Sequence, residues 1–353
     1  MAELFCGPGG LALGALRAEV ESDASIYRIR PVWANDIDVN ACATYKRNIH
    51  PDGAGIVLSG PVEKIDFKKT PSFDGLAFGF PCNDFSRVGE QRGINGHYGP
   101  LYSYGVKAIS LHNPQWFIAE NVSGLSNADS GETFNVILHE LENSGKYGYK
   151  LTVHLYKFEE YGVPQQRHRI IIVGIRQDIG LDFKVPEPIT KHPSEQISAK
   201  EAIENPPIPS DAANNELTRQ SKNVVERLKY IKPGQNAWTA ELPANLKLNV
   251  KGAKLSQIYR RLKPNKPSYT VTGSGGGGTH MYHWEEPRAL TNRERARLQT
   301  FPDDFIFSGS KEQVRKQIGM AVPPKGAEII FNALLNTLVG LEYQSVEANY
   351  VFE

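Results

Sequence analysis

The stretch Ala2-Glu3-Leu4-Phe5-Cys6-Gly7-Pro8-Gly9-Gly10-Leu11 runs from a short apolar segment through a glycine-rich turn into a helical pattern. Glycines in such a turn permit positive φ angles and let a ligand approach the backbone closely. Together with Ala12 they fit the dinucleotide-binding spacing, and Asp36 or Asp38 follows at a distance suited to ribose hydroxyls. The turn predicts a nucleoside-bearing cofactor and leaves open whether it is NAD or S-adenosylmethionine.

Short apolar runs alternate with amphipathic stretches through the first half of the chain. The expected strands are Ala2–Phe5, Val32–Asn35, Gly75–Phe78, Trp116–Glu120, Tyr149–Tyr156 and Ile170–Ile175, and the expected helices are Leu11–Arg17, Val39–Asn48, Tyr104–His112 and Thr133–Glu142. This alternation predicts an α/β, Rossmann-like, mostly parallel sheet with helices on both faces. Ligands bind beyond the carboxyl ends of strands in such sheets. The loops Cys6–Gly10, Asp36–Asp38, Phe80–Gly99 and Asn121–Leu125 are therefore the expected functional loops.

The residue composition changes after about Phe183, and the regular alternation of strand and helix patterns ends there. Prolines cluster from Pro186 to Pro209, a glycine run follows at Gly273–Gly278, and helical patterns return at Asn292–Gln299 and Lys325–Leu341. We expect residues 1–183 to form a cofactor-binding and catalytic domain. Residues 184–285 would form a smaller, irregular domain, and residues 286–353 would return to the first domain.

Composition is ordinary for a soluble globular protein, with 40% hydrophobic and 22% charged residues. No apolar run approaches the ~20 residues that span a bilayer, and no charged-then-apolar leader opens the chain. The three cysteines have no paired spacing, which argues against a disulfide framework and a zinc site. We expect a cytoplasmic protein with reduced thiols, no bound metal and no membrane partner.

Positive charge is concentrated between Arg219 and Lys266. This segment holds twelve basic and two acidic residues, so it carries +10 while the rest of the chain carries −9. A basic segment on an acidic body is what binding of nucleic acid phosphates requires, although a lysine-rich solvated surface would look the same.

Three further segments carry groups suited to catalysis. Cys82 follows an apolar strand in a polar, glycine-dotted stretch, a setting that favours an accessible thiolate over a buried thiol. Glu120 stands at the carboxyl end of a strand, where an acid or base is useful. Gln165-Gln166-Arg167-His168-Arg169 places long polar groups on one face of an extended segment.

The joint order of these segments is more specific than each of them. Phe-x-Gly-x-Gly-Gly, Pro-Cys, Glu-Asn-Val and Gln-x-Arg-x-Arg are followed by Arg288-Ala-Leu-Thr-x-Arg-Glu-x-Ala-Arg-Leu-Gln-x-Phe-Pro302 and Gly319-Met-Ala-Val-Pro-Pro324. From Glu3 to about Leu341 the chain resembles the DNA (cytosine-5) methyltransferase family, in particular the bacterial restriction-modification enzymes. That family keeps its target recognition domain where residues 184–285 lie.

The resemblance implies covalent catalysis on cytosine. Cys82 would add to carbon 6, which turns carbon 5 into a nucleophile for the sulfonium methyl group. Glu120 would contact the ring near N3, Arg167 would hold the pyrimidine carbonyl, and Arg169 would support Cys82 and the ring. The target base would be flipped out of duplex DNA, and the loop Phe80–Gly99 would close behind it.

The resemblance also implies a set of binding residues. S-adenosyl-L-methionine would be held by residues of the first turn and of later strand ends, namely Phe5, Gly7, Gly9, Gly10, Asp36, Ile37, Pro81, Leu101 and Val322. DNA would be contacted by Ser86, Asn121, Val122, Gln165 and Thr270. The protein would act as a monomer on double-stranded DNA at the bacterial nucleoid, alongside a separate cognate restriction endonuclease.

Two positions depart from the family pattern. Pro61 stands where the family commonly has an acid that contacts adenine, and Met320 replaces the usual asparagine of the last block. These departures leave a catalytically impaired relative open as an alternative. An RNA cytosine-5 methyltransferase and a nicotinamide-dependent dehydrogenase are the others, but the dehydrogenase leaves the Pro-Cys loop and the basic segment unexplained.

Overall fold

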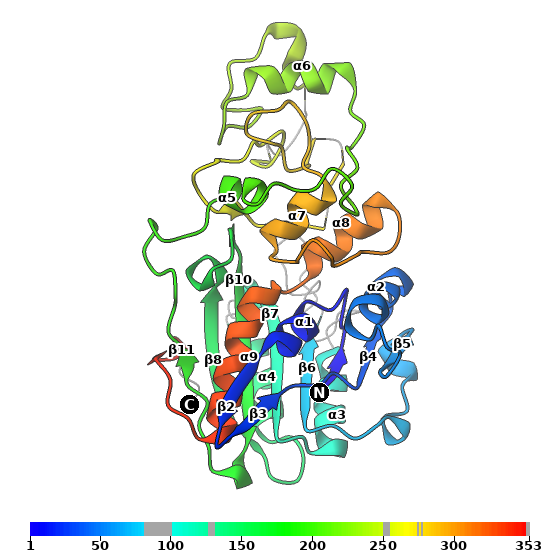
Figure 1. Cartoon of the computed structure of the whole chain (residues 1–353), viewed down its shortest axis with the longest axis vertical. Helices are drawn as coiled ribbons and strands as arrows, with labels where there is room; N and C mark the ends of the chain where they lie inside the picture. The colour runs from blue at the N-terminus through cyan, green and yellow to red at the C-terminus, as the bar shows by residue number, and fades with distance from the viewer. Residues whose placement is uncertain (81–100, 126–130, 250–254, 274, 277, 351–353) are drawn as a thin grey trace. The chain divides into compact units, whose positions relative to one another are not determined.

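The computed structural model describes residues 1–80, 101–125, 131–249, 255–273, 275, 276 and 278–350. Within them the chain forms two compact units (Figure 1). The first unit comprises Met1–Lys157, His168–Pro188 and Pro324–Glu353, and the second comprises Phe158–Arg167 and Ile189–Pro323. The divisions fall elsewhere than the expected boundaries, because residues 286–323 pack with the second unit and only the segment from Pro324 belongs to the first.

The first unit is built on a seven-stranded sheet in the order β5-β4-β1-β6-β7-β10-β8. Its strands are β1 (Ala2–Leu4), β4 (Trp33–Asp36), β5 (Ile56–Ser59), β6 (Gly75–Gly79), β7 (Trp116–Val122), β8 (Tyr149–Lys157) and β10 (His168–Arg176). Strands β5 to β7 of this order run parallel, and β10 is antiparallel to both of its neighbours. The predicted α/β fold with a mostly parallel sheet is confirmed.

In the described part of the first unit, two small antiparallel pairs and five α-helices accompany the sheet. The pairs are β2 (Glu19–Ser22) with β3 (Ser25–Arg28) and β11 (Val185–Pro186) with β13 (Ser345–Val346). The helices are α1 (Gly10–Arg17), α2 (Val39–Ile49), α3 (Tyr102–His112), α4 (Glu132–Glu142) and α9 (Pro324–Val339). No helix in the described part of the chain is long and apolar enough to cross a membrane.

Burial of apolar side chains along the central strands holds this sheet together. Leu4, Leu76, Phe78 and Phe117 are fully buried in one cluster to which α3 and α4 also contribute. Strands buried on both faces need nearly continuous apolar sequence, which is why these runs could be recognised as strands.

The second unit has little sheet. It contains the parallel pair β9 (Gln165–Gln166) and β12 (Ser268–Tyr269), and the helices α5 (Ala199–Glu204), α6 (Lys222–Tyr230), α7 (Asn292–Leu298) and α8 (Lys311–Met320). A small core around Leu228, Ile231, Tyr259 and Tyr282 supports the part that includes α6.

Helix α1 packs directly on α9 at Gly14. A Cβ at Gly14 would lie 2.5 Å from the Ala327 Cβ and 2.7 Å from the Glu328 backbone nitrogen. The cost of this close contact should exceed the roughly 1 kcal/mol that alanine gains over glycine in a helix. We therefore expect Gly14→Ala to lower the free energy of unfolding by about 1–3 kcal/mol. Chemical denaturation measures this, with Gly124→Ala as the control because open space surrounds Gly124. Equal stability of the two variants would contradict the predicted close packing.

Candidate active site

The turn after β1 is the first part of the site and uses three positive φ angles. Phe5, Gly7 and Gly9 have φ values of 55°, 53° and 99°. No atom lies within 4 Å of the place where a Gly7 Cβ would be, whereas one at Gly9 would lie 3.0 Å from Ile49 and Tyr45 side chains. The turn is thus open on the side of Gly7 and closely packed on the side of Gly9, and Gly10 begins α1.

Asp36 at the end of β4 fastens this turn to the neighbouring strand. Its Oδ2 accepts a hydrogen bond of 2.8 Å from the Gly7 backbone N–H, and its Oδ1 accepts one of 2.8 Å from the Asp38 N–H. The next residue, Ile37, is 71% exposed, which is unusual for a large apolar side chain. A carboxylate and an exposed apolar side chain therefore lie side by side at the carboxyl ends of β1 and β4, the kind of place where a nucleoside binds.

Glu120 and Arg169 form an ion pair on neighbouring strands. Glu120 Oε1 lies 2.8 Å from Arg169 Nε, and both side chains are 13% exposed. In the register of β7 with β10, Arg169 lies opposite Val122, so it reaches Glu120 diagonally along the same face. Burial lowers the pKa of the Arg169 guanidinium, and Glu120 raises it in turn. The carboxylate is thereby held in one orientation with little water around it.

A glycine on the next strand makes room for that carboxylate. Gly79 pairs with Glu120 in the parallel register of β6 and β7, and a Cβ at Gly79 would lie 2.9 Å from Glu120 Oε2. The adjacent Asn121 donates from Nδ2 to the Phe80 carbonyl at 3.1 Å, which fixes the exit of β6. Sequence reasoning missed Gly79, although a glycine at the end of a buried strand signals a close approach.

If the chain has the methyltransferase activity that the sequence resemblance implies, Gly79→Ala is expected to displace the Glu120 carboxylate and lower kcat about ten- to hundredfold, with little effect on DNA affinity. The effect should disappear in a Glu120→Gln background, because the two changes act on the same group. Single-turnover methylation rates for the four combinations measure this coupling. Independent, multiplicative losses would show that Gly79 acts in some other way.

Several predicted site residues lie outside the described residues, namely Pro81, Cys82 and Ser86. Their assignments stay predictions. Leu101, the first described residue after this gap, is buried and precedes α3. Asn121 and Val122 lie within β7 itself, because this strand runs two residues beyond the predicted end at Glu120.

Of the three polar residues expected on one face, Gln165 and Arg167 share the Val271 backbone as a partner, and Arg169 does not. Gln165 is fully buried, donates to the Leu298 carbonyl, and accepts at 2.7 Å from the Val271 N–H. Arg167 is 1% exposed and donates to the carbonyls of Val271 and Gly319 at 3.1 and 3.0 Å. Both side chains therefore link backbone segments inside the second unit, whereas Arg169 pairs with Glu120 in the first unit.

Other expected contacts also lie in the second unit. Thr270 donates from Oγ1 to the Gln166 carbonyl at 2.6 Å. Val322 is buried, and Met320 at the end of α8 is 64% exposed.

The half-buried Pro61 directly precedes a short 3₁₀ helix in the first unit. Among the described residues no group of three or more His, Cys, Asp or Glu side chains could hold a metal ion.

One protein family matches nearly the whole chain. The family of C-5 cytosine-specific DNA methylases matches residues 1–336. The chain belongs to the C-5 cytosine-specific DNA methylase family. It is accordingly a DNA (cytosine-5-)-methyltransferase of the restriction-modification type, as the sequence predicts.

Individual relatives support this assignment to the methylase family. The type II methyltransferase M.BbvI of Brevibacillus brevis is 58% identical over 99% of this chain and 94% of that protein. The DNA (cytosine-5-)-methyltransferase M.ApeKI of Aeropyrum pernix is 31% identical over 95% and 98% of the two chains. A crystal structure named for a DNA modification methyltransferase of an E. coli prophage has a TM-score of 0.71 at 23% identity, covering 96% and 99% of the chains, and shows the fold.

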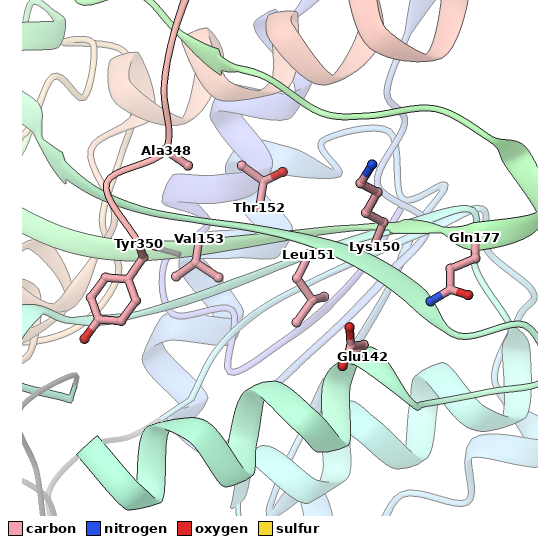
Figure 2. A pocket seen from close by; sticks show the side chains of 8 residues that line it. All are labelled: Glu142, Lys150, Leu151, Thr152, Val153, Gln177, Ala348 and Tyr350. Atoms are coloured by element: carbon pink, nitrogen blue, oxygen red, sulfur yellow. The ribbon is translucent and has the colours of Figure 1, made fainter. Parts of the chain in front are cut away.

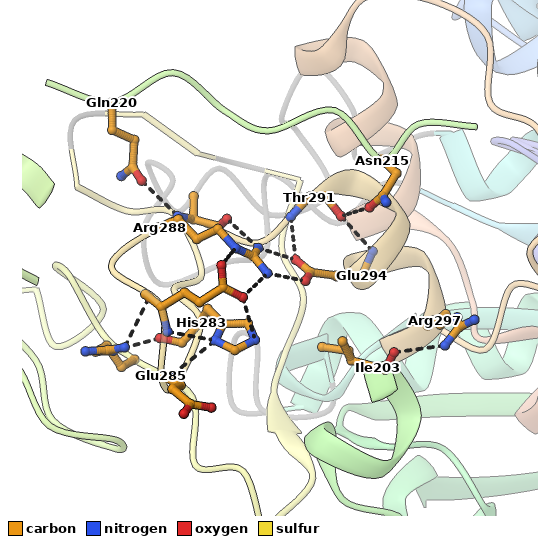
Figure 3. A network of polar contacts seen from close by, with 12 residues as sticks. Ile203, Asn215, Gln220, His283, Glu285, Arg288, Thr291, Glu294 and Arg297 are labelled. Atoms are coloured by element: carbon orange, nitrogen blue, oxygen red, sulfur yellow. Dashed lines mark hydrogen bonds and ion pairs between the residues drawn. The ribbon is translucent and has the colours of Figure 1, made fainter. Parts of the chain in front are cut away.

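Within this methylase, the block around α7 forms a polar network (Figure 3). Thr291 and Glu294 make a capping box at the start of α7. Arg288 pairs with Glu294 at 2.7 Å and with Glu286 at 2.9 Å, and these carboxylates keep the Arg288 pKa high against the effect of burial. Thr291, Glu294 and Arg288 of this block thus fix the start of α7.

A separate cavity of about 360 Å³ lies at the edge strand β8 of the methylase (Figure 2). It is lined by Glu142 of α4, by Lys150 and Thr152 of β8, and by Tyr350 near the end of the chain. None of the predicted site residues lines it. This cavity is therefore not part of the candidate active site.

Proposed function

We propose that the protein transfers a methyl group from S-adenosyl-L-methionine to carbon 5 of cytosine within a specific duplex DNA sequence. The observation that carries this proposal is the Glu120–Arg169 ion pair, held above Gly79 at the carboxyl ends of β6 and β7 in a chain of the methylase family. A fixed, water-poor carboxylate beside a permanent cation is suited to bind a pyrimidine ring and to stabilise charge that develops on it.

Cys82 supplies the nucleophile. The other two cysteines are buried, and burial raises the pKa of both thiols, so they stay protonated near neutral pH. The Cys82 thiolate would form a bond to carbon 6, and the electron pair displaced from the C5–C6 double bond would leave carbon 5 nucleophilic. After methyl transfer, loss of the carbon 5 proton to a base expels the thiolate and restores the aromatic ring.

Glu120 and Arg169 would act on the ring of the same base. Glu120 would hydrogen-bond at N3, which draws electron density away from carbon 6. We assign the pyrimidine carbonyl to Arg169 in preference to Arg167. Both terminal nitrogens of Arg167 already donate to backbone carbonyls, whereas Arg169 donates in this way from Nη1, to the His168 carbonyl. Arg167 would instead hold the Val271 and Gly319 segments together.

The turn after β1 fits S-adenosyl-L-methionine, which would supply an electrophilic methyl group. Asp36 offers carboxylate oxygens for ribose hydroxyls, Ile37 and Phe5 offer apolar surface for adenine, and the open side of Gly7 leaves the backbone accessible. Leu101 and Val322 remain proposed cofactor residues, and the departures at Pro61 and Met320 would lower the affinity for the cofactor.

The substrate would be double-stranded DNA at the nucleoid, recognised by a monomer through the second unit. Flipping the target base costs a few kcal/mol, which contacts to the phosphate backbone would offset. A cognate restriction endonuclease would act separately on the same sequence, which methylation protects.

Radiolabelled methyl transfer to duplex DNA and to tRNA tests the proposal, followed by bisulfite sequencing of DNA from cells that express the protein. We expect incorporation into duplex DNA at one repeated sequence. Preferential labelling of tRNA would favour an RNA methyltransferase. Binding of cofactor and DNA without incorporation would favour an impaired relative.

A further inference from the structure

A cavity of about 410 Å³ in the second unit, apart from the residues assigned to the reaction, has a strongly basic lining. Arg260, Arg261, Lys263 and Lys266 contribute to its wall, together with the carboxylate of Glu159. Lys263 and Lys266 are exposed and Arg260 is half-buried, so their charges are accessible from solvent. The lining therefore carries an excess of positive charge at a place that a small anionic group could enter.

The wall of this cavity is held in place by backbone contacts. The Lys266 and Pro264 carbonyls accept from the N–H groups of Ala199 and Lys200 at the start of α5, at 2.9 and 3.1 Å. On the other side, the Ser268 N–H donates to the Pro164 carbonyl at 2.9 Å. A rigid wall lowers the entropy cost of binding a ligand.

Polar groups of the lining remain available for a ligand. Ser268 is 1% exposed and lines the cavity, and its Oγ has no hydrogen-bond partner among the described residues. The Arg260 guanidinium lies 4.5 Å from the centre of the Tyr269 ring, which orients it without using its N–H donors. By contrast, the buried Arg261 donates to several backbone carbonyls and contributes charge only.

Arg295 and Arg315 do not line this cavity, but the Arg295 charge acts on Tyr269, which does line it. Arg295 is 1% exposed, and its Nε and Nη1 have no hydrogen-bond partner among the described residues. Arg315 is 8% exposed, and its Nε is likewise without a partner in the described part of the chain. Burial and the Arg315 charge lower the pKa of Arg295, and Glu294 opposes this shift without cancelling it, so an anion nearby would stabilise this cation.

We propose that this cavity, which we call the basic pocket, binds a phosphate group of the DNA backbone. Its volume of about 410 Å³ admits a phosphodiester group, and its donors are Arg260, Lys263, Lys266 and the Ser268 hydroxyl. The first three belong to the segment with the net charge of +10. The inference rests on the proposed function for the identity of the ligand. It adds a binding site that fixes the position of the duplex and reads no base.

The test compares Lys263→Gln/Lys266→Gln with wild type in duplex binding at several salt concentrations. The double variant should lower affinity about tenfold at low salt and reduce the slope of log K against log [salt] by about 1, since each neutralised phosphate contributes ~0.9. The ratio of affinities for methylation-target and unrelated duplexes should stay unchanged, because phosphate contacts carry no sequence information.

Lys222→Gln/Lys247→Gln is the matched control, since both lysines are exposed, belong to the same basic segment and do not line the basic pocket. Lys266→Gln alone should show the same trend and leaves the Lys263 stem packed on Gly234. The proposal would be overturned if log K fell with log [salt] as steeply for the pocket variant as for the control variant. A second result would also overturn it. If inorganic phosphate raised the Tm of wild type but not of the pocket variant, while the salt dependence of duplex binding was the same for both, the site would take free phosphate and not DNA. Absence of methyl transfer by wild type would instead refute the proposed function.

Discussion

Replacing Cys82 with serine is expected to abolish methyl transfer. A serine hydroxyl is far less nucleophilic than a thiolate near neutral pH, so carbon 5 of cytosine would no longer be activated. Binding of S-adenosyl-L-methionine should persist, because the turn after β1 and Asp36 are untouched. Turnover on duplex DNA and cofactor calorimetry together measure these two effects.

The covalent step has its own signature. Wild type should form a stable adduct with DNA that carries 5-fluorocytosine at the target, because fluorine cannot leave as a proton does. Cys42→Ser should still form the adduct, since Cys42 is a buried thiol of α2 with no role in the reaction. Normal turnover by wild type without any trapped complex would exclude attack by Cys82.

Replacing Glu120 with glutamine is expected to lower kcat at least about 100-fold. Glutamine fills the same space above Gly79 but cannot form the ion pair with Arg169. The cation is then left partly buried without its partner, so some stability is lost as well. Rates measured well below the Tm of the variant separate the catalytic loss from unfolding.

Glu142→Gln is the matched control for this change. Glu142 lies at the end of α4, lines the cavity at β8 and is not part of the Glu120–Arg169 ion pair. Its replacement should leave kcat unchanged. If Glu120→Gln retained the wild-type rate, Glu120 would have no part in the mechanism and the ion pair would be structural.

The central sheet could be predicted because its strands are buried on both faces. Short continuous apolar runs such as Trp116–Ala119 indicate strands that are buried on both faces. The glycine turn before α1 also marked the end of the first strand. Strand β5 was missed because Ile56–Ser59 is partly exposed at the edge of the sheet. Helix α8 was missed although Ser310 and Gln313 form a capping box, a signal that the sequence does contain.

Several candidate site residues could be recognised in the sequence, but their partners could not. Glu120 and Arg169 are each recognisable, yet their pairing depends on the long register between β7 and β10. Period-two spacing placed Arg167 with Arg169, but the chain passes from the second unit to the first between Arg167 and His168. A local pattern cannot show such a change, because it is set by contacts with Val271 and Gly319 far along the sequence.

The packing of α1 on α9 has a consequence for synthesis on the ribosome. Helix α1 emerges early, whereas α9, which covers it at Gly14, begins only at Pro324. At ordinary elongation rates the interval is on the order of half a minute. The nascent first unit therefore lacks one of its layers until the entire second unit has been made, so a truncated chain would remain incompletely folded around its glycine turn.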